Sequence, residues 1–199
     1  LFKQLIDNKT RIENKLKVNL NLKAICSSKK MLLEEFKSNS VSYLQNLKDN
    51  GQPLNYPSLI AYLKETDFSH TVIIDCTASE EVVNQYHYLL ENDFHIITPN
   101  KKASSGPIER FNKIKQICLK KYRHFLYEAN VCAGMPVIKT LQDLVATGDV
   151  IYQIKGVFSG TLSYLFNEFS SGIAFSKALT NAYELGLTEP DPRDDLNGV

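Results

Sequence analysis

A surplus of either charge is absent from this 199-residue sequence, because its 23 Lys and Arg residues nearly balance its 22 Asp and Glu residues, for a formal net charge of +1. Binding to a phosphate backbone needs a surplus of Lys and Arg on one face, so this balance argues against nucleic acid as the main partner. Long apolar runs and anything that resembles a signal peptide are also absent, which argues against membrane functions. With 43% apolar and 23% charged residues, the composition is typical of a globular protein with a real core.

Paired metal ligands are absent as well. The four cysteines, Cys26, Cys76, Cys118 and Cys132, form no Cys-x-x-Cys pair, and the four histidines form no His-x-x-x-His. Four cysteines without such spacing fit a reducing compartment best. We therefore expect a cytoplasmic protein.

A Gly-x-Gly-x-x-Gly loop is the most informative absence. Residues 1–16 have helical apolar spacing with no N-cap in front of them, so the chain reads as beginning inside a helix. We expect the first strand and its glycine turn to lie upstream of Leu1. The backbone amides that cradle a pyrophosphate would then be missing from these 199 residues.

Short apolar runs alternate with amphipathic stretches along most of the chain. The pattern predicts strands over 20–26, 71–76, 94–98, 124–127 and helices over 1–16, 40–48, 57–65, 79–92, 107–122. Crossovers of a dozen residues or more favour an α/β fold with a parallel sheet flanked by helices. The β-branched run Thr71–Cys76 is typical of a strand that is buried on both faces of such a sheet.

The regular alternation of expected strands and helices ends near residue 130. Beyond it, the spacing predicts helices over 138–144, 162–169 and 175–185 and a strand over 150–158. We therefore place a domain boundary there, which gives domains of residues 1–130 and 131–199.

Ligands of open parallel sheets bind outside the carboxyl ends of the strands. The residues at those places here include Ser28, Thr77, Ser79 and Lys101. Ser79 also reads as a helix N-cap, and the two roles are compatible because the same amide cluster binds anions. Lys101 reads equally as part of a solvated loop.

Ser28 stands where a fold that prefers NAD usually offers an acidic residue to the ribose hydroxyls. Lys29 and Lys30 follow it, and they would tolerate or attract a 2′-phosphate instead. This is a weak indication of NADP.

The segment Thr188–Val199 displays carboxylates on stiff backbone. Its prolines force the preceding residues, Glu189 and Asp191, out of the helical region, which suits recognition of a small cationic group. The alternative is a turn in which Asp194 or Asp195 caps a following helix.

Five segments, taken in order, resemble homoserine dehydrogenases, in particular the dehydrogenase half of the bifunctional aspartate kinase/homoserine dehydrogenase enzymes. They are Ile74–Ser79, Thr98–Ala103, Tyr127–Ile138, Gly156–Asn167 and Gly186–Gly198. The resemblance implies an incomplete Rossmann-type NAD(P)-binding domain, followed by the first part of an α+β homoserine-binding and dimerisation domain. It also implies the reversible, NAD(P)-dependent oxidation of L-homoserine to L-aspartate 4-semialdehyde in a homo-oligomer.

Site residues follow from the same resemblance. Thr77, Ser79 and Lys101 match cofactor contacts, and Lys101 is also proposed in the family to assist proton transfer. Thr161, Glu189 and Asp195 match homoserine-binding positions, and we expect Lys101, Glu189 and Asp195 to carry the chemistry within this chain.

A monovalent cation, usually sodium, is held beside the site in the family. Its ligands, mostly backbone carbonyls, match Glu128, Val131, Ala133 and Met135. Asn130 stands where Thr is frequent, and Cys132 where Gly is frequent. Cys132 threatens the cation only if that position needs a positive φ.

The resemblance also places an Asp and a Lys, the main acid/base pair of the family, just beyond Val199. We therefore expect the 199 residues alone to be inactive. Two alternatives stay open: a related amino-acid or semialdehyde dehydrogenase, and a non-catalytic binding or dimerisation module. The choice between NAD and NADP, and whether an aspartate kinase domain is fused in front, also stay open.

Overall fold

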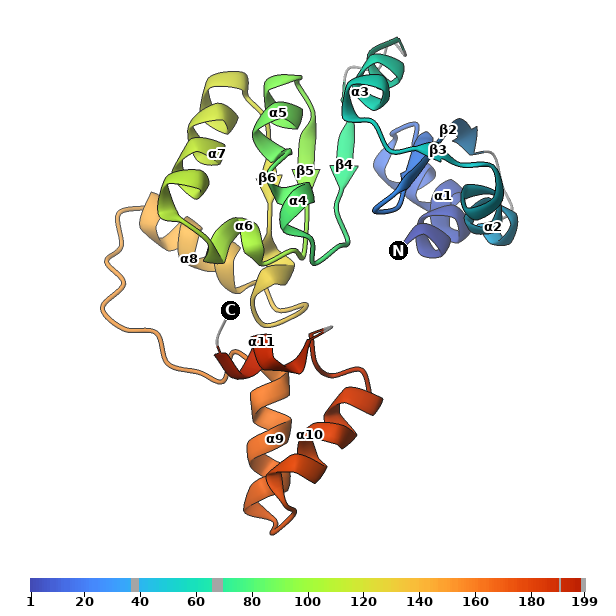
Figure 1. Cartoon of the computed structure of the whole chain (residues 1–199). Helices are drawn as coiled ribbons and strands as arrows, with labels where there is room; N and C mark the ends of the chain where they lie inside the picture. Colours follow the sequence, from blue (N-terminus) through green and yellow to red (C-terminus); the bar gives the residue numbers. More distant parts are fainter. Residues whose placement is uncertain (37–39, 66–69, 190, 198–199) are drawn as a thin grey trace. The chain divides into compact units, whose positions relative to one another are not determined.

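The computed structural model describes residues 1–36, 40–65, 70–189 and 191–197, and it divides into two compact units, Leu1–Thr71 and Val72–Val199 (Figure 1). The domain boundary that the sequence predicts near residue 130 does not coincide with this division, and it stays a prediction.

The first unit is built on an antiparallel sheet. β2 pairs antiparallel with both β1 and β3, and Phe36 of β2 packs edge to face against Phe2 and Tyr43, with ring centroids 5.8 and 4.7 Å away. The helical spacing of residues 1–16 is confirmed. The elements of this unit are α1 (Phe2–Leu16), β1 (Leu22–Cys26), β2 (Lys30–Phe36), α2 (Ser40–Asn50), β3 (Gln52–Pro53) and α3 (Tyr56–Glu65).

The prediction that residues 20–26 join a parallel sheet is wrong. Ser27 reverses the chain directly after β1: its hydroxyl accepts a hydrogen bond from the Lys30 N–H at 3.0 Å, and its own N–H donates to the Lys30 carbonyl at 2.8 Å. The chain therefore returns as β2 beside β1. The sequence pattern missed β2 because its apolar residues do not alternate with its Lys and Glu residues.

The second unit begins with the parallel sheet that the alternation predicts, in the order β4-β5-β6. Helices connect these strands, and Figure 1 shows α4, α5 and α7 over one face of the sheet. The predicted helix over 79–92 is divided into α4 and α5. The elements are β4 (Val72–Ile74), α4 (Glu80–Val83), α5 (Tyr86–Glu91), β5 (His95–Ile97), α6 (Lys102–Ser105), α7 (Ile108–Lys121) and β6 (Phe125–Leu126).

The two faces of this sheet differ in burial. Ile96 and Phe125 lie in the buried row under the helices, whereas Ile74, Ile97 and Leu126 are 38%, 39% and 51% exposed. The predicted burial of Thr71–Cys76 on both faces is therefore wrong. A β-branched run permits burial on both faces, but a second covering layer is needed to achieve it.

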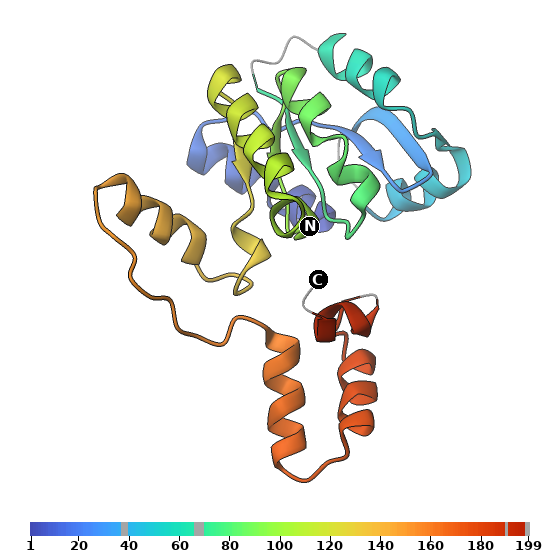
Figure 2. The same ribbon diagram turned by 60° about the vertical axis from the view of Figure 1, so that its left-hand side comes forward.

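A helical region follows the sheet. Its largest packed part is the hairpin of α9 and α10 (Figure 2), in which Ala178 and Ala182 let the helices approach closely around Leu165. Ser159 caps α9 by accepting a hydrogen bond from the Leu162 N–H at 3.1 Å. The elements are a 3₁₀ turn η1 (Glu128–Asn130), α8 (Val137–Ala146), α9 (Gly160–Ser170), α10 (Phe175–Glu184) and α11 (Pro192–Asn197).

The predicted strand over 150–158 is not formed. These residues run between α8 and α9 without regular structure, and alternate apolar side chains, Val150, Tyr152 and Ile154, are exposed. A strand needs a hydrogen-bonding neighbour, and no strand of the described residues pairs with this segment. No described helix is both long enough and apolar enough to cross a membrane.

Candidate active site

The carboxyl ends of β4 and β5 lie side by side. The register pairs Ile74 with Ile97, and the backbone N–H of Asp75 continues the ladder by donating to the Ile97 carbonyl at 3.0 Å. The turn 77–79 and the loop 98–101 therefore leave the sheet at the same edge. These two segments hold three of the predicted cofactor contacts.

A buried polar network joins the two segments. Asp75 is only 4% exposed, and its Oδ2 accepts hydrogen bonds from Tyr86 Oη at 2.5 Å and Asn100 Nδ2 at 3.1 Å. Its Oδ1 accepts the Thr77 N–H at 2.8 Å. Thr98 Oγ1 lies 3.0 Å from Tyr86 Oη and accepts the Asn100 N–H at 2.8 Å. Buried polar groups persist only when they are hydrogen-bonded in this way, so the network fixes both segments.

No sequence pattern assigns a role to Asp75, Tyr86 or Asn100. One signal could have found them: Asp75 is a carboxylate that closes an otherwise apolar strand. A charged residue at such a place needs partners, and nearby strand ends are where those partners come from.

Ser79 occupies the N-cap position of α4 with extended backbone, as predicted, but its side chain makes no capping hydrogen bond. Its N–H donates to Thr77 Oγ1 at 3.2 Å, which tightens the turn. The Ser79 hydroxyl is therefore not committed to the helix. The N-cap position is confirmed, and the cofactor contact stays a prediction.

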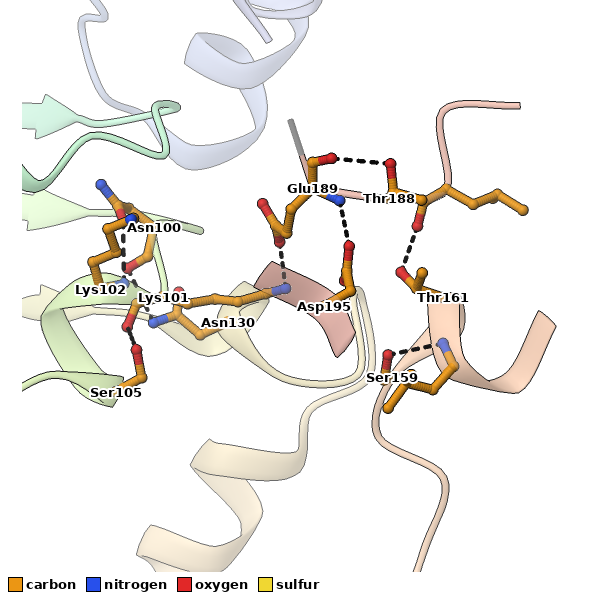
Figure 3. Close-up of polar contacts among 12 residues, drawn as sticks. Asn100, Lys101, Lys102, Ser105, Asn130, Ser159, Thr161, Thr188, Glu189 and Asp195 are labelled. Atoms are coloured by element: carbon orange, nitrogen blue, oxygen red, sulfur yellow. Dashed lines mark hydrogen bonds and ion pairs between the residues drawn. The ribbon is translucent and has the colours of Figure 1, made fainter. Parts of the chain in front are cut away.

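Lys101 meets the acidic segment. Its Nζ lies 2.5 Å from Glu189 Oε1, and Figure 3 shows the two side chains pointing toward one another. The Lys101 side chain is 47% exposed and that of Glu189 is 29% exposed, so this pair is open to solvent and to ligands. The structure thus brings together a predicted cofactor residue and a predicted substrate residue.

Thr161 and Asp195 hold the backbone that leads into Glu189 (Figure 3). The Thr161 hydroxyl donates to the Leu187 carbonyl at 2.5 Å, and Asp195 Oδ2 accepts the Glu189 N–H at 2.7 Å. The three predicted substrate residues are therefore neighbours. In the structure, Thr161 and Asp195 orient the segment that presents Glu189.

The acidic segment ends in α11, and Asp191 precedes that helix. Asp191 Oδ1 accepts the Arg193 N–H at 3.0 Å, so Asp191 caps the helix, whereas Asp194 and Asp195 lie in its first turn. The capping roles proposed for the latter two are wrong. The side-chain hydrogen bonds from Arg193, and then its backbone N–H, lower the pKa of Asp191 to about 2.

The predicted cation segment follows β6. The carboxylate of Glu128 caps α8, because its two oxygens accept the N–H groups of Ile138 at 2.9 Å and Lys139 at 2.8 Å. The carbonyl of Met135 accepts the Val137 N–H at 2.9 Å. Both the Glu128 carboxylate and the Met135 carbonyl are therefore engaged in hydrogen bonds, and the cation site stays a prediction. Residues 1–36, 40–65, 70–189 and 191–197 contain no group of three His, Cys, Asp or Glu side chains suited to a metal.

Cys132 adopts φ 56°, and its neighbour Ala133 adopts φ 52°. Both angles lie in the left-handed region that glycine adopts without strain. Position 132 therefore has the positive φ under which a cysteine, in place of glycine, is expected to disturb this segment.

A pocket of about 460 Å³ opens beside the Lys101 loop. Burial raises the pKa of Tyr127, although a hydrogen bond from Gln142 opposes that effect. Asn130 ties the pocket wall to the loop, because one end of its amide lies 2.7 Å from Ser104 Oγ. The lining residues are Lys101, Ser104, Ser105, Phe111, Tyr127, Asn130, Val131 and Ile138.

Ser28 lies in the first unit, in the reversal between β1 and β2. The strand before it is antiparallel, so the argument from parallel strand ends does not apply to Ser28. Its role as a cofactor contact stays a prediction.

Comparison with known families matches two consecutive stretches of the chain. Residues 1–128 match the family described as homoserine dehydrogenase, NAD binding domain, and residues 136–199 match the family described as homoserine dehydrogenase. The chain is also 43% identical over 200 residues to a protein of Daucus carota named bifunctional aspartokinase/homoserine dehydrogenase, chloroplastic. That match covers 100% of this chain and 22% of the relative, so the chain spans about a fifth of the relative's length.

Solved structures have the same fold. A putative homoserine dehydrogenase of Archaeoglobus fulgidus superposes with a TM-score of 0.71 at 24% identity, covering 98% of this chain and 59% of that one. A hyperthermophilic archaeal homoserine dehydrogenase in complex with NADPH superposes with a TM-score of 0.66 at 19% identity, covering 95% and 60%. These likenesses show the fold, and the matches in sequence show that the chain belongs to the homoserine dehydrogenase family.

Proposed function

We propose that this chain supplies part of the cofactor and substrate site of an NAD(P)-dependent oxidoreductase that interconverts L-homoserine and L-aspartate 4-semialdehyde. The observation that carries the proposal is the 2.5 Å contact between Lys101 Nζ and Glu189 Oε1. It joins the end of a parallel strand, where a nicotinamide cofactor would be held, to a carboxylate suited to an amino-acid ammonium group.

The residues fit the cofactor. Thr77, Ser79 and Lys101 stand at the shared edge of β4 and β5, where parallel sheets bind dinucleotides, and they would hold it there. When bound, the nicotinamide group supplies the hydride chemistry. One solved structure of similar fold is named as a complex with NADPH, and NADP is the form of the cofactor that we propose here.

Glu189 binds the substrate ammonium, and Asp195 and Thr161 keep its backbone in place through the bonds described above. Lys101 assists proton transfer at the reacting oxygen, alongside the separate Asp and Lys that the resemblance implies as the main acid/base pair. Its ammonium donates a hydrogen bond to the aldehyde oxygen in the reducing direction. Carbonyl oxygens of the segment 131–135 would hold a monovalent cation beside these residues.

The test is Glu189→Gln in the natural protein that carries these residues. Losing one partner of a charge pair in the occupied, desolvated site commonly costs about 2 to 5 kcal/mol, so KM for homoserine should rise at least tenfold. KM for NADP should stay within twofold. Steady-state kinetics with each substrate varied in turn measures both constants.

Asp194→Asn is the matched control, because it removes an equal charge from the same segment without touching Lys101. Homoserine kinetics should match the parent in that variant. The proposal is wrong if Glu189→Gln leaves homoserine kinetics unchanged or weakens only NADP binding.

The remaining expectations stay predictions. The 199 residues alone should be inactive because they carry no glycine-rich pyrophosphate loop and because the resemblance places the main acid/base pair outside them. The protein should be a cytoplasmic homo-oligomer, although the Daucus carota relative is named as chloroplastic. A non-catalytic binding module would bind NADPH in the natural protein without turning over homoserine.

A further inference from the structure

Asp75 has no part in the proposed chemistry, yet the network at the sheet edge is organised around it. It is the buried charged group among Tyr86, Thr98 and Asn100. Such a charge is costly to bury, which raises the question of what the hydrogen bonds around it accomplish.

The hydrogen bonds that join Thr98, Tyr86 and Asp75 have a fixed donor-to-acceptor direction. The Tyr86 hydroxyl has a single proton, which goes to the Asp75 carboxylate at 2.5 Å. The Thr98 hydroxyl, 3.0 Å away, is then the donor to Tyr86 Oη, while its oxygen accepts the Asn100 N–H. In this series of hydrogen bonds, from Asn100 through Thr98 and Tyr86, each group therefore donates toward Asp75.

The Asn100 side chain connects this buried network to the turn 77–79 and to the loop 98–102. Its Nδ2 donates to Asp75 Oδ2 and to the Ser79 carbonyl, both at 3.1 Å. Its Oδ1 accepts the Lys102 N–H at 3.2 Å. The amide group thus clamps the turn 77–79 to the loop 98–102.

Lys101 lies within that clamped loop. Its carbonyl accepts hydrogen bonds from the hydroxyls of Ser104 and Ser105, each at 3.0 Å. Its backbone is therefore tied on both sides, although its side chain is half exposed. The position of Lys101 relative to Thr77 and Ser79 is determined by the buried network.

We propose that Asp75 is a positioning residue, which sets the spacing between the turn 77–79 and Lys101 so that both meet one nicotinamide cofactor. The inference rests on the proposed function, since it concerns the cofactor side of that site. A carboxylate suits this task because it only accepts hydrogen bonds. An amide at this place has one acceptor oxygen where the carboxylate uses two, so either the bond from the Thr77 N–H or the bond from Asn100 Nδ2 would be lost.

The experiment compares Asp75→Asn with Ile114→Val in the natural protein. Ile114 is buried on α7 outside the network, so it controls for a general loss of stability. Displacement of site residues commonly costs on the order of 10- to 100-fold, and we expect the Kd for NADPH, measured by nucleotide fluorescence, to rise by that factor in Asp75→Asn alone. KM for homoserine should change less than the Kd for NADPH, because Glu189, which binds the substrate ammonium, lies outside the clamp. The kcat should fall, because Lys101 is displaced from the reacting oxygen.

Amide hydrogen exchange provides a readout that needs no nucleotide. The Lys102 N–H donates its hydrogen bond to Asn100 rather than to Asp75, so its exchange rate reports on the clamp. The rate should rise in Asp75→Asn and stay unchanged in Ile114→Val. A role confined to the strand end would leave the Lys102 amide unchanged. If Asp75→Asn does not fold, Asn100→Ala tests the same clamp without altering the buried charge, and the same two changes are expected.

The outcomes separate the two proposals. A parent protein that binds neither NADPH nor NADH overturns the proposed function. A parent that binds NADPH, with variants that bind it equally well or lose NADPH and homoserine affinity in parallel, overturns the role of Asp75 alone.

Discussion

The candidate site has a sheet side, at the ends of β4 and β5, and an acidic side, around Glu189, and different interactions stabilise the two. On the sheet side, Asp75, Tyr86, Thr98 and Asn100 are buried, and so are the hydrogen bonds that join these four residues. On the acidic side, side chains hold the backbone at Leu187 and Glu189, and the Glu189 carboxylate forms one ion pair with the half-exposed Lys101.

Burial explains why this difference matters. A hydrogen bond to a buried charge cannot be replaced by water, whereas an exposed ion pair contributes at most about 1 kcal/mol. The sheet side is therefore arranged by folding itself. The acidic side is arranged by a contact that a cationic ligand can replace.

The largest effect on stability is expected from Tyr86→Phe. It removes one hydroxyl from the buried network and leaves the ring in place, so the free energy of unfolding should fall by about 2 kcal/mol. Glu189→Gln, on the exposed side, should lower it by less than about 1 kcal/mol. Urea denaturation measures both.

Tyr183→Phe is the control, since Tyr183 is exposed on α10, and it should leave the unfolding curve unchanged. Equal losses in Tyr86→Phe and Glu189→Gln would mean that the two sides are not held differently.

A smaller effect, of opposite sign, is expected at Cys132, which belongs to neither side. Cys132→Gly relieves a left-handed backbone at φ 56°, and unfolding should become less favourable by about 0.5 to 1 kcal/mol. Cys132→Ala removes the thiol but keeps the Cβ atom, so it should give no such gain. A gain in both variants would assign the effect to the thiol rather than to the backbone.

The smallest effect concerns the Asp191–Arg193 pair at the exposed end of the acidic segment. Because the pKa of Asp191 is lowered to about 2 in the folded state, the pair favours folding above the ordinary value of 3.8. That contribution is lost as the pH falls from 3.8 toward 2. Arg193→Ala should raise the pKa of Asp191 but leave it below 3.8, because the backbone N–H at position 193 still donates.

Carbon NMR of the Asp191 carboxyl during an acid titration measures this pKa. Arg193→Lys keeps the charge and loses the paired hydrogen bonds, so its value should lie between those of the parent and Arg193→Ala. An unchanged pKa in both variants would contradict the pairing.

Local patterns predicted the elements around the site well. The strands at 71–76 and 94–98 and the helices at 107–122 and 175–185 agree with β4, β5, α7 and α10 to within a few residues. Such elements follow from side-chain periodicity over neighbouring residues. The strand expected over 150–158 has the same kind of pattern, but no partner strand pairs with it among the described residues.

The sequence by itself determined the α/β character of the chain, the parallel strands and which segments follow their carboxyl ends, because these depend on residues close together in the chain. Only the tertiary structure decided that β1 returns antiparallel beside β2, that Asp75 meets Asn100 across 25 positions and that Lys101 meets Glu189 across 88. Those contacts depend on which groups are buried together and which partners reach them. That information is carried by the packing of distant segments and not by local periodicity.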